Sequence, residues 1–151
     1  MPRLAPRLYR PTPDVDQAGL EYLAAAFALC GDEGRTQIAI GTMSNRFPKY
    51  TLVTAIALPE AAAALALQSG QAQKAIDALE LARRYEAGAE FRPQYLRELA
   101  YLQLRSGDLA AAEFQKILNH RGQGLLSVLY PLAQLGLARS ASSPVYRFTR
   151  H

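Results

Sequence analysis

Apolar residues recur along most of the chain at the three- and four-residue spacing of one face of an α-helix. Between residues 15 and 30, for example, Leu20, Ala24 and Phe27 share one face. Short segments that contain glycine or proline separate these stretches from one another. The pattern predicts helices over residues 15–30, 35–46, 51–69, 72–85, 94–105, 109–119 and 125–139, with a loop over 86–93.

Prolines mark the ends of this pattern and interrupt it twice. Pro59 and Pro131 each fall inside a predicted helix, so each of these helices either begins near its proline or is kinked there. Four prolines among residues 1–14 predict an irregular lead-in. The helical spacing is lost in residues 140–151, where we expect an irregular basic tail, so the predicted helical domain covers residues 15–139.

The composition supports a helical fold. Alanine and leucine supply 27 and 23 of the 151 residues, whereas valine and isoleucine together supply nine. Alanine and leucine favour helices, and β-branched residues favour strands. Half of the residues are apolar, which is enough for a core, and the length suits one domain or a short run of repeats. We therefore predict an all-α protein.

The predicted helices alternate with turns in a repeating order: helix, tight turn, helix, longer loop. This order recurs about every 34 residues, the period of the tetratricopeptide repeat (TPR). Glu98 and Ala66 depart from the pattern, and so does Gly107, which is displaced by two positions. The residues that fit it are Leu23, Ala24, Phe27, Gly31, Asp32, Phe47 and Pro48, then Ala62, Ala63, Gly70, Ala75, Ile76, Leu79 and Ala82, then Tyr101, Gly107, Ala110, Phe114, Ile117 and Leu118, and finally Leu132, Leu135, Gly136, Leu137 and Ala138.

On these residues the chain resembles TPR proteins. The resemblance implies a right-handed α-solenoid of about three TPR-like helical hairpins plus an unpaired C-terminal helix. Residues 95–104, 110–122 and 132–139 are similar to the repeat segment that follows the kinase domain in many bacterial serine/threonine protein kinases. This closer resemblance covers most of residues 18–139 and departs at Ser140, where the family would continue the helix.

The TPR resemblance also implies a binding face. In that family the first helix of each repeat lines a groove that holds a peptide, and Arg92, Tyr95 and Gln103 are the side chains best suited to a peptide backbone or carboxylate. The face would carry Glu21, Glu60, Ala64, Gln68, Arg92, Tyr95, Leu99 and Gln103, of which the polar residues Glu21, Glu60, Gln68, Arg92, Tyr95 and Gln103 are the predicted partner-binding residues.

Catalytic motifs are missing from the sequence. There is no glycine-rich phosphate loop, no Asp-Phe-Gly and no Gly-x-Ser-x-Gly. We expect Cys30 to be a buried structural thiol and His120 to be a surface residue near a helix end. Neither a metal site nor a cofactor is expected, and the prediction is that the protein is not an enzyme.

The formal net charge of +4 comes from the ends of the chain, where six of the 17 basic residues lie. Two solvated tails explain this distribution better than a nucleic-acid interface, so nucleic acid is an unlikely partner. No apolar stretch reaches the roughly 20 residues that a membrane span needs, and no secretory signal is present, which together favour a cytoplasmic protein.

We therefore expect a non-enzymatic scaffold that presents a concave helical groove to a protein or peptide. Two alternatives remain open: a detached regulatory segment of a bacterial serine/threonine kinase, and weak nucleic-acid binding through the basic termini. The last predicted helix carries Leu126, Leu129, Leu132, Leu135 and Leu137 with no helix after it to cover them. It is expected either to be covered by residues 140–151 or to form a homodimer.

Overall fold

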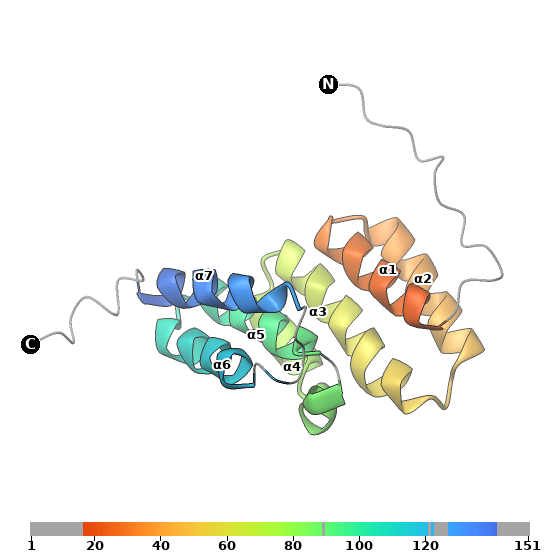
Figure 1. The fold of residues 1–151 in the computed structure, drawn as a ribbon. Coiled ribbons are helices and arrows are strands. Elements are labelled where there is room, and N and C mark those ends of the chain that lie inside the picture. The colour runs from red at the N-terminus through yellow and green to blue at the C-terminus, as the bar shows by residue number, and fades with distance from the viewer. Residues whose placement is uncertain (1–16, 89, 121, 123–126, 142–151) are drawn as a thin grey trace, which may run out of the picture.

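The computed structural model describes residues 17–88, 90–120, 122 and 127–141. Within this part every regular element is a helix and no strand occurs, which confirms the predicted all-α fold (Figure 1). The predicted lead-in and most of the predicted tail lie outside the described residues. The elements are α1 (Gln17–Leu29), α2 (Glu33–Arg46), the π-helical segment η1 (Val53–Ala57), α3 (Leu58–Gln68), α4 (Ala72–Ala78), the 3₁₀ segment η2 (Leu81–Gly88), α5 (Arg92–Gln103), α6 (Gly107–Asn119) and α7 (Leu129–Ala141).

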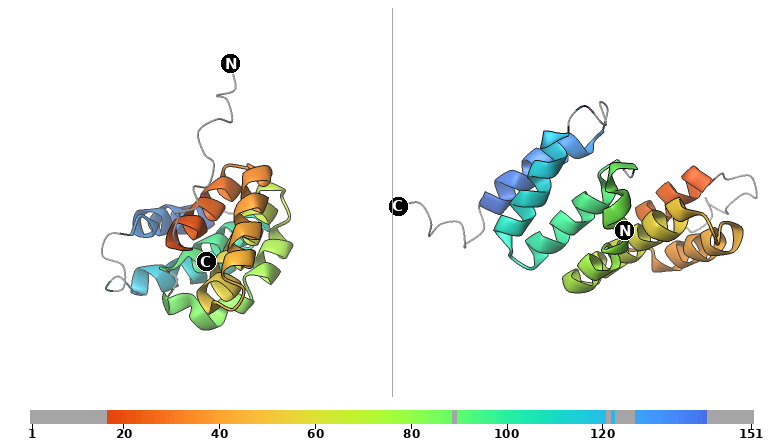
Figure 2. Two further views of the ribbon diagram at one scale, coloured as in Figure 1. Left: turned by 90° about the vertical axis from the view of Figure 1, so that its right-hand side faces the viewer. Right: turned by 90° about the horizontal axis from the view of Figure 1, so that it is seen from below.

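Successive helices pack side by side, in the order of the chain. The pairs α1 and α2, α3 and α4, and α5 and α6 are each joined by a short turn and lie in contact. The first helices of these pairs also contact one another, because α3 lies against both α1 and α5, and α5 lies against α7. The right-hand view of Figure 2 shows the succession along the molecule, from α1 and α2 at one end to α6 and α7 at the other.

The three short turns share one hydrogen-bonding pattern. After α1, the N–H groups of Gly31 and Asp32 donate to the carbonyls of Ala28 and Phe27, which is a Schellman motif. Gly70 occupies the same place after α3, and both glycines have the left-handed backbone that this position requires, with φ angles of 73° and 70°. After α5 the position is held by Arg105, with φ 57°. This explains the displaced Gly107, which is the first residue of α6 instead.

Pro59 does not end a helix. Helical backbone runs from residue 51 to residue 68, and the turn before the proline widens to the π form, in which Leu58 N–H donates to Val53 O. A proline lacks an N–H and its ring crowds the carbonyl four residues earlier, so a wider turn relieves that contact. Of the two expected outcomes, a helix that starts near Pro59 and a kink, the late start is wrong, because helical backbone begins at residue 51 and passes through the π-helical turn into α3.

The helix predicted over residues 72–85 is present from Ala72, but its second half is wrong. α4 ends at Ala78 and the chain continues as η2, in which Ala82 and Arg83 donate to carbonyls three residues earlier. The guanidinium of Arg97 lies 3.5 Å from the carbonyl of Leu79 and takes part of its hydrogen-bonding capacity. The predicted loop over 86–93 is shorter for the same reason, because η2 extends to Gly88 and α5 begins at Arg92.

The last helix begins near Pro131, which is one of the two expected outcomes, and it ends later than predicted. α7 starts at Leu129, with Pro131 in its first turn, where a missing N–H costs nothing. It continues through Ser140, which is buried and donates to Gly136 O at 3.0 Å, so the irregular tail expected from residue 140 does not begin there. Leu129 and Leu137 pack against the neighbouring helices, whereas Leu135 is exposed.

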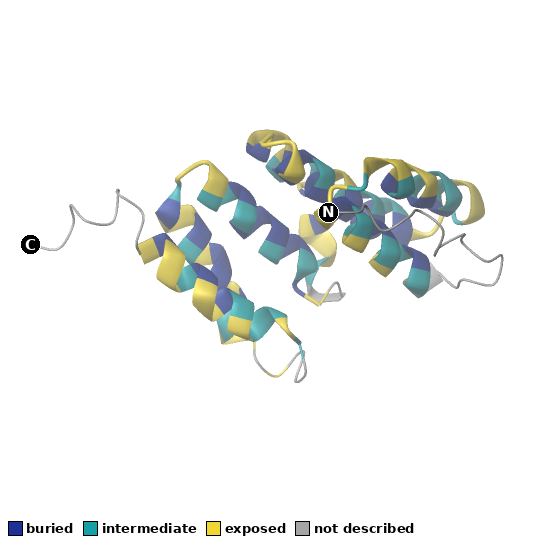
Figure 3. Ribbon diagram, turned by 90° about the horizontal axis from the view of Figure 1, so that it is seen from above, coloured by how far each residue is buried: buried dark blue, intermediate teal, exposed yellow. Residues whose placement is uncertain are grey.

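Alanine forms much of the core. Buried alanines lie between the helices in three clusters that follow one another along the molecule, and Figure 3 shows the buried positions on the facing sides of the helices. Small side chains let helix backbones approach closely, which agrees with the alanine-rich composition. The expectation of a buried Cys30 is wrong, because this residue follows the end of α1 and its thiol is exposed.

Candidate binding site

The first turns of α3 and α5 bring two of the predicted residues together. Glu60 follows Pro59 near the start of α3, and Arg92 is the first residue of α5, directly before Pro93. The guanidinium Nε of Arg92 lies 3.2 Å and 3.4 Å from the two carboxylate oxygens of Glu60. The Glu60 side chain is only 2% exposed, so this ion pair is largely withdrawn from water.

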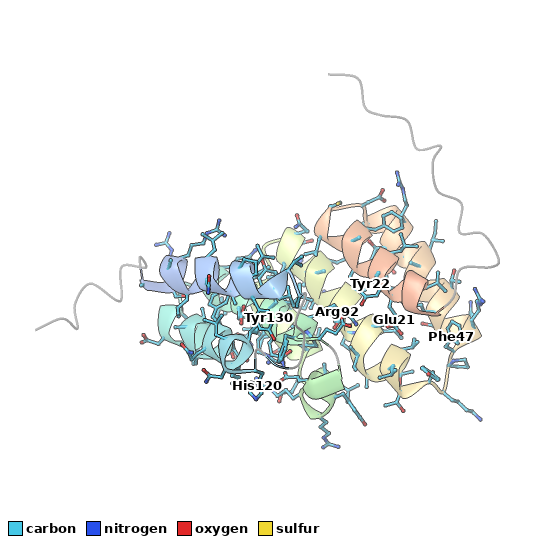
Figure 4. All side chains as sticks on the ribbon, viewed as in Figure 1. Glu21, Tyr22, Phe47, Arg92, His120 and Tyr130 are labelled. Carbon is cyan, nitrogen blue, oxygen red and sulfur yellow. The ribbon has the colours of Figure 1, made fainter. Side chains whose placement is uncertain are left out.

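α1 adds an aromatic ring to the pair. The ring centroid of Tyr22 lies 4.8 Å from the guanidinium carbon of Arg92, and its hydroxyl donates to Glu90 at 3.1 Å. A contact of this kind is a cation–π interaction. Tyr22, Glu60, Glu90 and Arg92, which we call the Arg92 cluster, therefore join α1, α3 and the turn before α5. Figure 4 shows Tyr22 and Arg92 beside each other, with Glu21 close by.

The turn that leads into α5 is strained. Glu90 and Phe91 both have left-handed backbone, with φ angles of 50° and 65°, although neither is glycine. This conformation costs a residue with a side chain about 1 kcal/mol or more. The buried ring of Phe91, which lies 6.4 Å from that of Tyr130, and the contacts of Glu90 in the Arg92 cluster hold the turn in place.

Burial dominates the electrostatics of this cluster. It raises the pKa of Glu60 to about 7, against the opposing effect of the Arg92 charge and hydrogen bond. The carboxylates of Glu21 and Glu90 add to the rise. The guanidinium of Arg92 is bound to Glu60 and stacked on Tyr22. A ligand carboxylate, which Arg92 was predicted to hold, would have to compete with these contacts.

The other predicted residues lie elsewhere. Gln103 donates to Leu67 O at 3.0 Å and so ties α5 to the end of α3. Tyr95 is half-buried against the cluster formed by α6 and α7, and burial, followed by the charge of Glu98, raises its pKa. Ala64 is fully buried and cannot line an open face. The structure thus brings Glu21, Glu60 and Arg92 together, whereas Gln68 and Gln103 lie elsewhere and Tyr95, one turn after Arg92 on α5, packs against the cluster formed by α6 and α7.

Gln68 lines a separate hollow of about 590 Å³. This hollow lies between α2, α3 and α4, beside the turns at Gly31 and Ser69. Its lining mixes polar and apolar residues, which are Gly31, Glu33, Gln37, Ile40, Ala62, Leu65, Ala66, Gln68, Ser69, Gln71 and Lys74.

Sequence reasoning missed two members of the Arg92 cluster. Tyr22 directly follows the predicted residue Glu21 in the sequence, and this proximity was an available signal. Glu90 carried no signal, because its place depends on the strained turn. In the part of the chain that the structure describes, no three His, Cys, Asp or Glu side chains are grouped to hold a metal ion.

Comparison with protein-family models, with curated proteins and with solved structures finds no match for this chain. Among the helices of the described residues, none combines the length and the apolar character needed to cross a membrane. The fold and the Arg92 cluster are therefore the basis for assigning a function.

Proposed function

We propose that the protein is a non-enzymatic scaffold of TPR-like helical hairpins whose first helices present a binding face to another protein or a peptide. The packing order supports this proposal. Each pair of helices joined by a Schellman turn corresponds to one hairpin, and the contacts of α3 with α1 and α5 align the first helices in a row. In this arrangement α7 takes the place of the first helix of a fourth hairpin.

The Arg92 cluster is the observation that carries the binding proposal. It spans three first helices, and its Tyr22 ring stays half exposed although Arg92 covers part of it. Tyrosine and arginine are among the side chains that most often dominate the energy of protein interfaces. Glu21 and Arg92 form the centre of the proposed face, the buried Glu60 holds Arg92 in place beneath it, and Gln68, Tyr95 and Gln103 are its proposed periphery.

The test compares an exposed residue on this face with one on another helix. Tyr22 on α1 and Ile38 on α2 are 50% and 58% exposed, so Tyr22→Ser and Ile38→Ser form a matched pair. Tagged wild-type protein is used to capture partners from the native lysate at low and high salt, and each retained partner is purified and titrated against both variants. We expect Tyr22→Ser to weaken binding at least tenfold and Ile38→Ser to leave it within about twofold.

Other results would favour a different function or contradict the proposed face. A kinase retained at high salt would select the regulatory version of the scaffold. Nucleic acid that dissociates as salt rises would assign the function to the basic termini. A partner that binds both variants equally, or no retained partner at all, would contradict the proposed face. Far-UV circular dichroism of Tyr22→Ser separates a lost contact from a lost fold.

A further inference from the structure

α5 buries a carboxyl group that has no hydrogen-bond partner. Glu98 is 0% exposed, and neither of its oxygens is bonded to another group. One turn earlier on the helix, Oε1 of Gln94 is also buried without a partner. Three acceptors that lack a donor are costly in a core. If Glu98 carries a proton, its O–H becomes a hydrogen-bond donor. The amide oxygen of Gln94, four residues earlier on α5, supplies the acceptor.

The covering helix is α7. Tyr95, Tyr101 and Leu102 lie one turn from Glu98 on the surface of α5, and all three pack into the cluster that contains Ala133 of α7. Gly136 of α7 lies so close to the Phe114 ring of α6 that the two helices leave no space for a Cβ between them. Glu98 therefore lies on the side of α5 that α6 and α7 cover.

The charged groups around Glu98 do not stabilise its carboxylate enough to keep it ionised. Burial raises the pKa of Glu98 to about 9, and the charge of Glu113 on α6 adds to the rise, while Arg97 and Lys116 oppose it. Both cations are already paired with Glu113, and Arg97 also pairs with Glu86 of η2. Other titratable or charged groups on this side are Tyr95 and Tyr101 on α5 and Tyr130 and Arg139 on α7.

We propose that α7 is a proton-coupled cover: it closes over α5 only when Glu98 is protonated and donates to Gln94, and it opens with release of that proton. In the closed state the carboxylic acid is neutral. When α7 moves away, water reaches the carboxyl group, its O–H bond breaks, and the proton passes to solvent and leaves a hydrated carboxylate.

The opening of α7 is coupled to proton release from Glu98 at neutral pH. In the open state the Glu98 carboxyl has its ordinary pKa of 4.5, and in the closed state the value is about 9. Between these values opening releases one proton, so the ratio of open to closed α7 rises about tenfold for each pH unit. From pH 6 to pH 8 the open fraction therefore rises about a hundredfold.

Hydrogen exchange of the α7 amides measures this opening. After correction for the intrinsic pH dependence of exchange, the protection of α7 is expected to fall about a hundredfold between pH 6 and pH 8 in the wild type. Glu98→Gln, which keeps the shape and removes the ionisation, is expected to give protection that does not change with pH. Glu33→Gln, at an exposed position on α2, serves as the matched control and is expected to behave as the wild type.

Three results would overturn the proposal. They are a constant protection of α7 in the wild type, a pH response that Glu98→Gln retains, and a protection of α7 that equals that of α1 at both pH values, which would indicate that α7 opens only by global unfolding. The side-chain carboxyl carbon of Glu98 gives a second readout by NMR that needs no variant. It is expected not to titrate between pH 4 and pH 6, and a titration near pH 4.5 would also overturn the proposal.

Discussion

At Gly136, α7 packs very closely against the Phe114 ring of α6. A Cβ at this residue would lie 2.6 Å from Cε2 of Phe114 and still closer to Cζ and Cε1 of the same ring. Ordinary contacts between carbon atoms begin near 3.5 Å. Phe114 is fully buried, so its ring has no open space to enter. The change Gly136→Ala therefore forces α7 away from α6.

The expected change in the free energy of unfolding of Gly136→Ala is the difference between two opposing effects. Overpacking a tight core costs about 1–3 kcal/mol. Alanine in place of glycine inside a helix gains up to about 1 kcal/mol. A steric cost near the middle of its range predicts that Gly136→Ala lowers the free energy of unfolding by about 1 kcal/mol. At Gly41, within α2, an added Cβ would have no atom within 4 Å, so Gly41→Ala is expected to raise stability by up to about 1 kcal/mol.

Urea unfolding followed by far-UV circular dichroism measures both variants. A second pair, Phe114→Leu alone and with Gly136→Ala, tests the cause, because a smaller side chain makes room for the new methyl group. In that background Gly136→Ala is expected to be neutral or stabilising. If Gly136→Ala stabilises the wild-type chain as much as Gly41→Ala does, the close packing of α6 on α7 is refuted.

Three further predictions concern ionisation and the turns. In the folded protein Glu98 binds its proton up to a pKa of about 9 rather than 4.5, so the wild type loses stability as pH rises through this window. Glu98→Gln should therefore be more stable than the wild type by about 3 kcal/mol at pH 7 and nearly equal to it at pH 4, and equal stability at both pH values would exclude the buried carboxyl. At the Schellman turns, Arg105→Gly should stabilise and Gly70→Ala destabilise the fold by about 1 kcal/mol each, measured by urea unfolding, because both positions need left-handed backbone. The same sign for both would contradict this geometry. Asp32 accepts a hydrogen bond from Arg35 N–H at the start of α2, so Asp32→Ala should lower the unfolding free energy by about 1 kcal/mol in the same assay, and no change would show that the cap is not needed.

The sequence was informative wherever local chemistry decides the structure. The spacing of apolar residues located the helices, and glycines 31 and 70 marked two turns. Prediction from the sequence was wrong where a group that is distant along the chain determines the local structure. η2 replaces part of a predicted helix where Arg97, 18 residues away from Leu79, reaches its carbonyl. Arg105 holds a glycine position because the rest of the turn fixes its backbone.

The candidate site was predictable only in part. Spacing by one repeat placed Glu60 and Arg92 on neighbouring first helices, and the structure pairs them. It did not indicate that Glu60 is withdrawn from water, since burial depends on the approach of α1. Glu98 departs from the TPR pattern at a place where a small residue is expected. Its burial without a partner shows that such a departure marks an unusual position in the structure.

The central claim is that the face made by the first helices contacts a partner. A photo-reactive phenylalanine analogue placed at Tyr22, or at Ile38 as the control, tests it with a partner purified from the capture experiment. We expect a covalent adduct from position 22 and none from position 38. Adducts from position 38 alone, or equal yields from both positions, would contradict the proposed face.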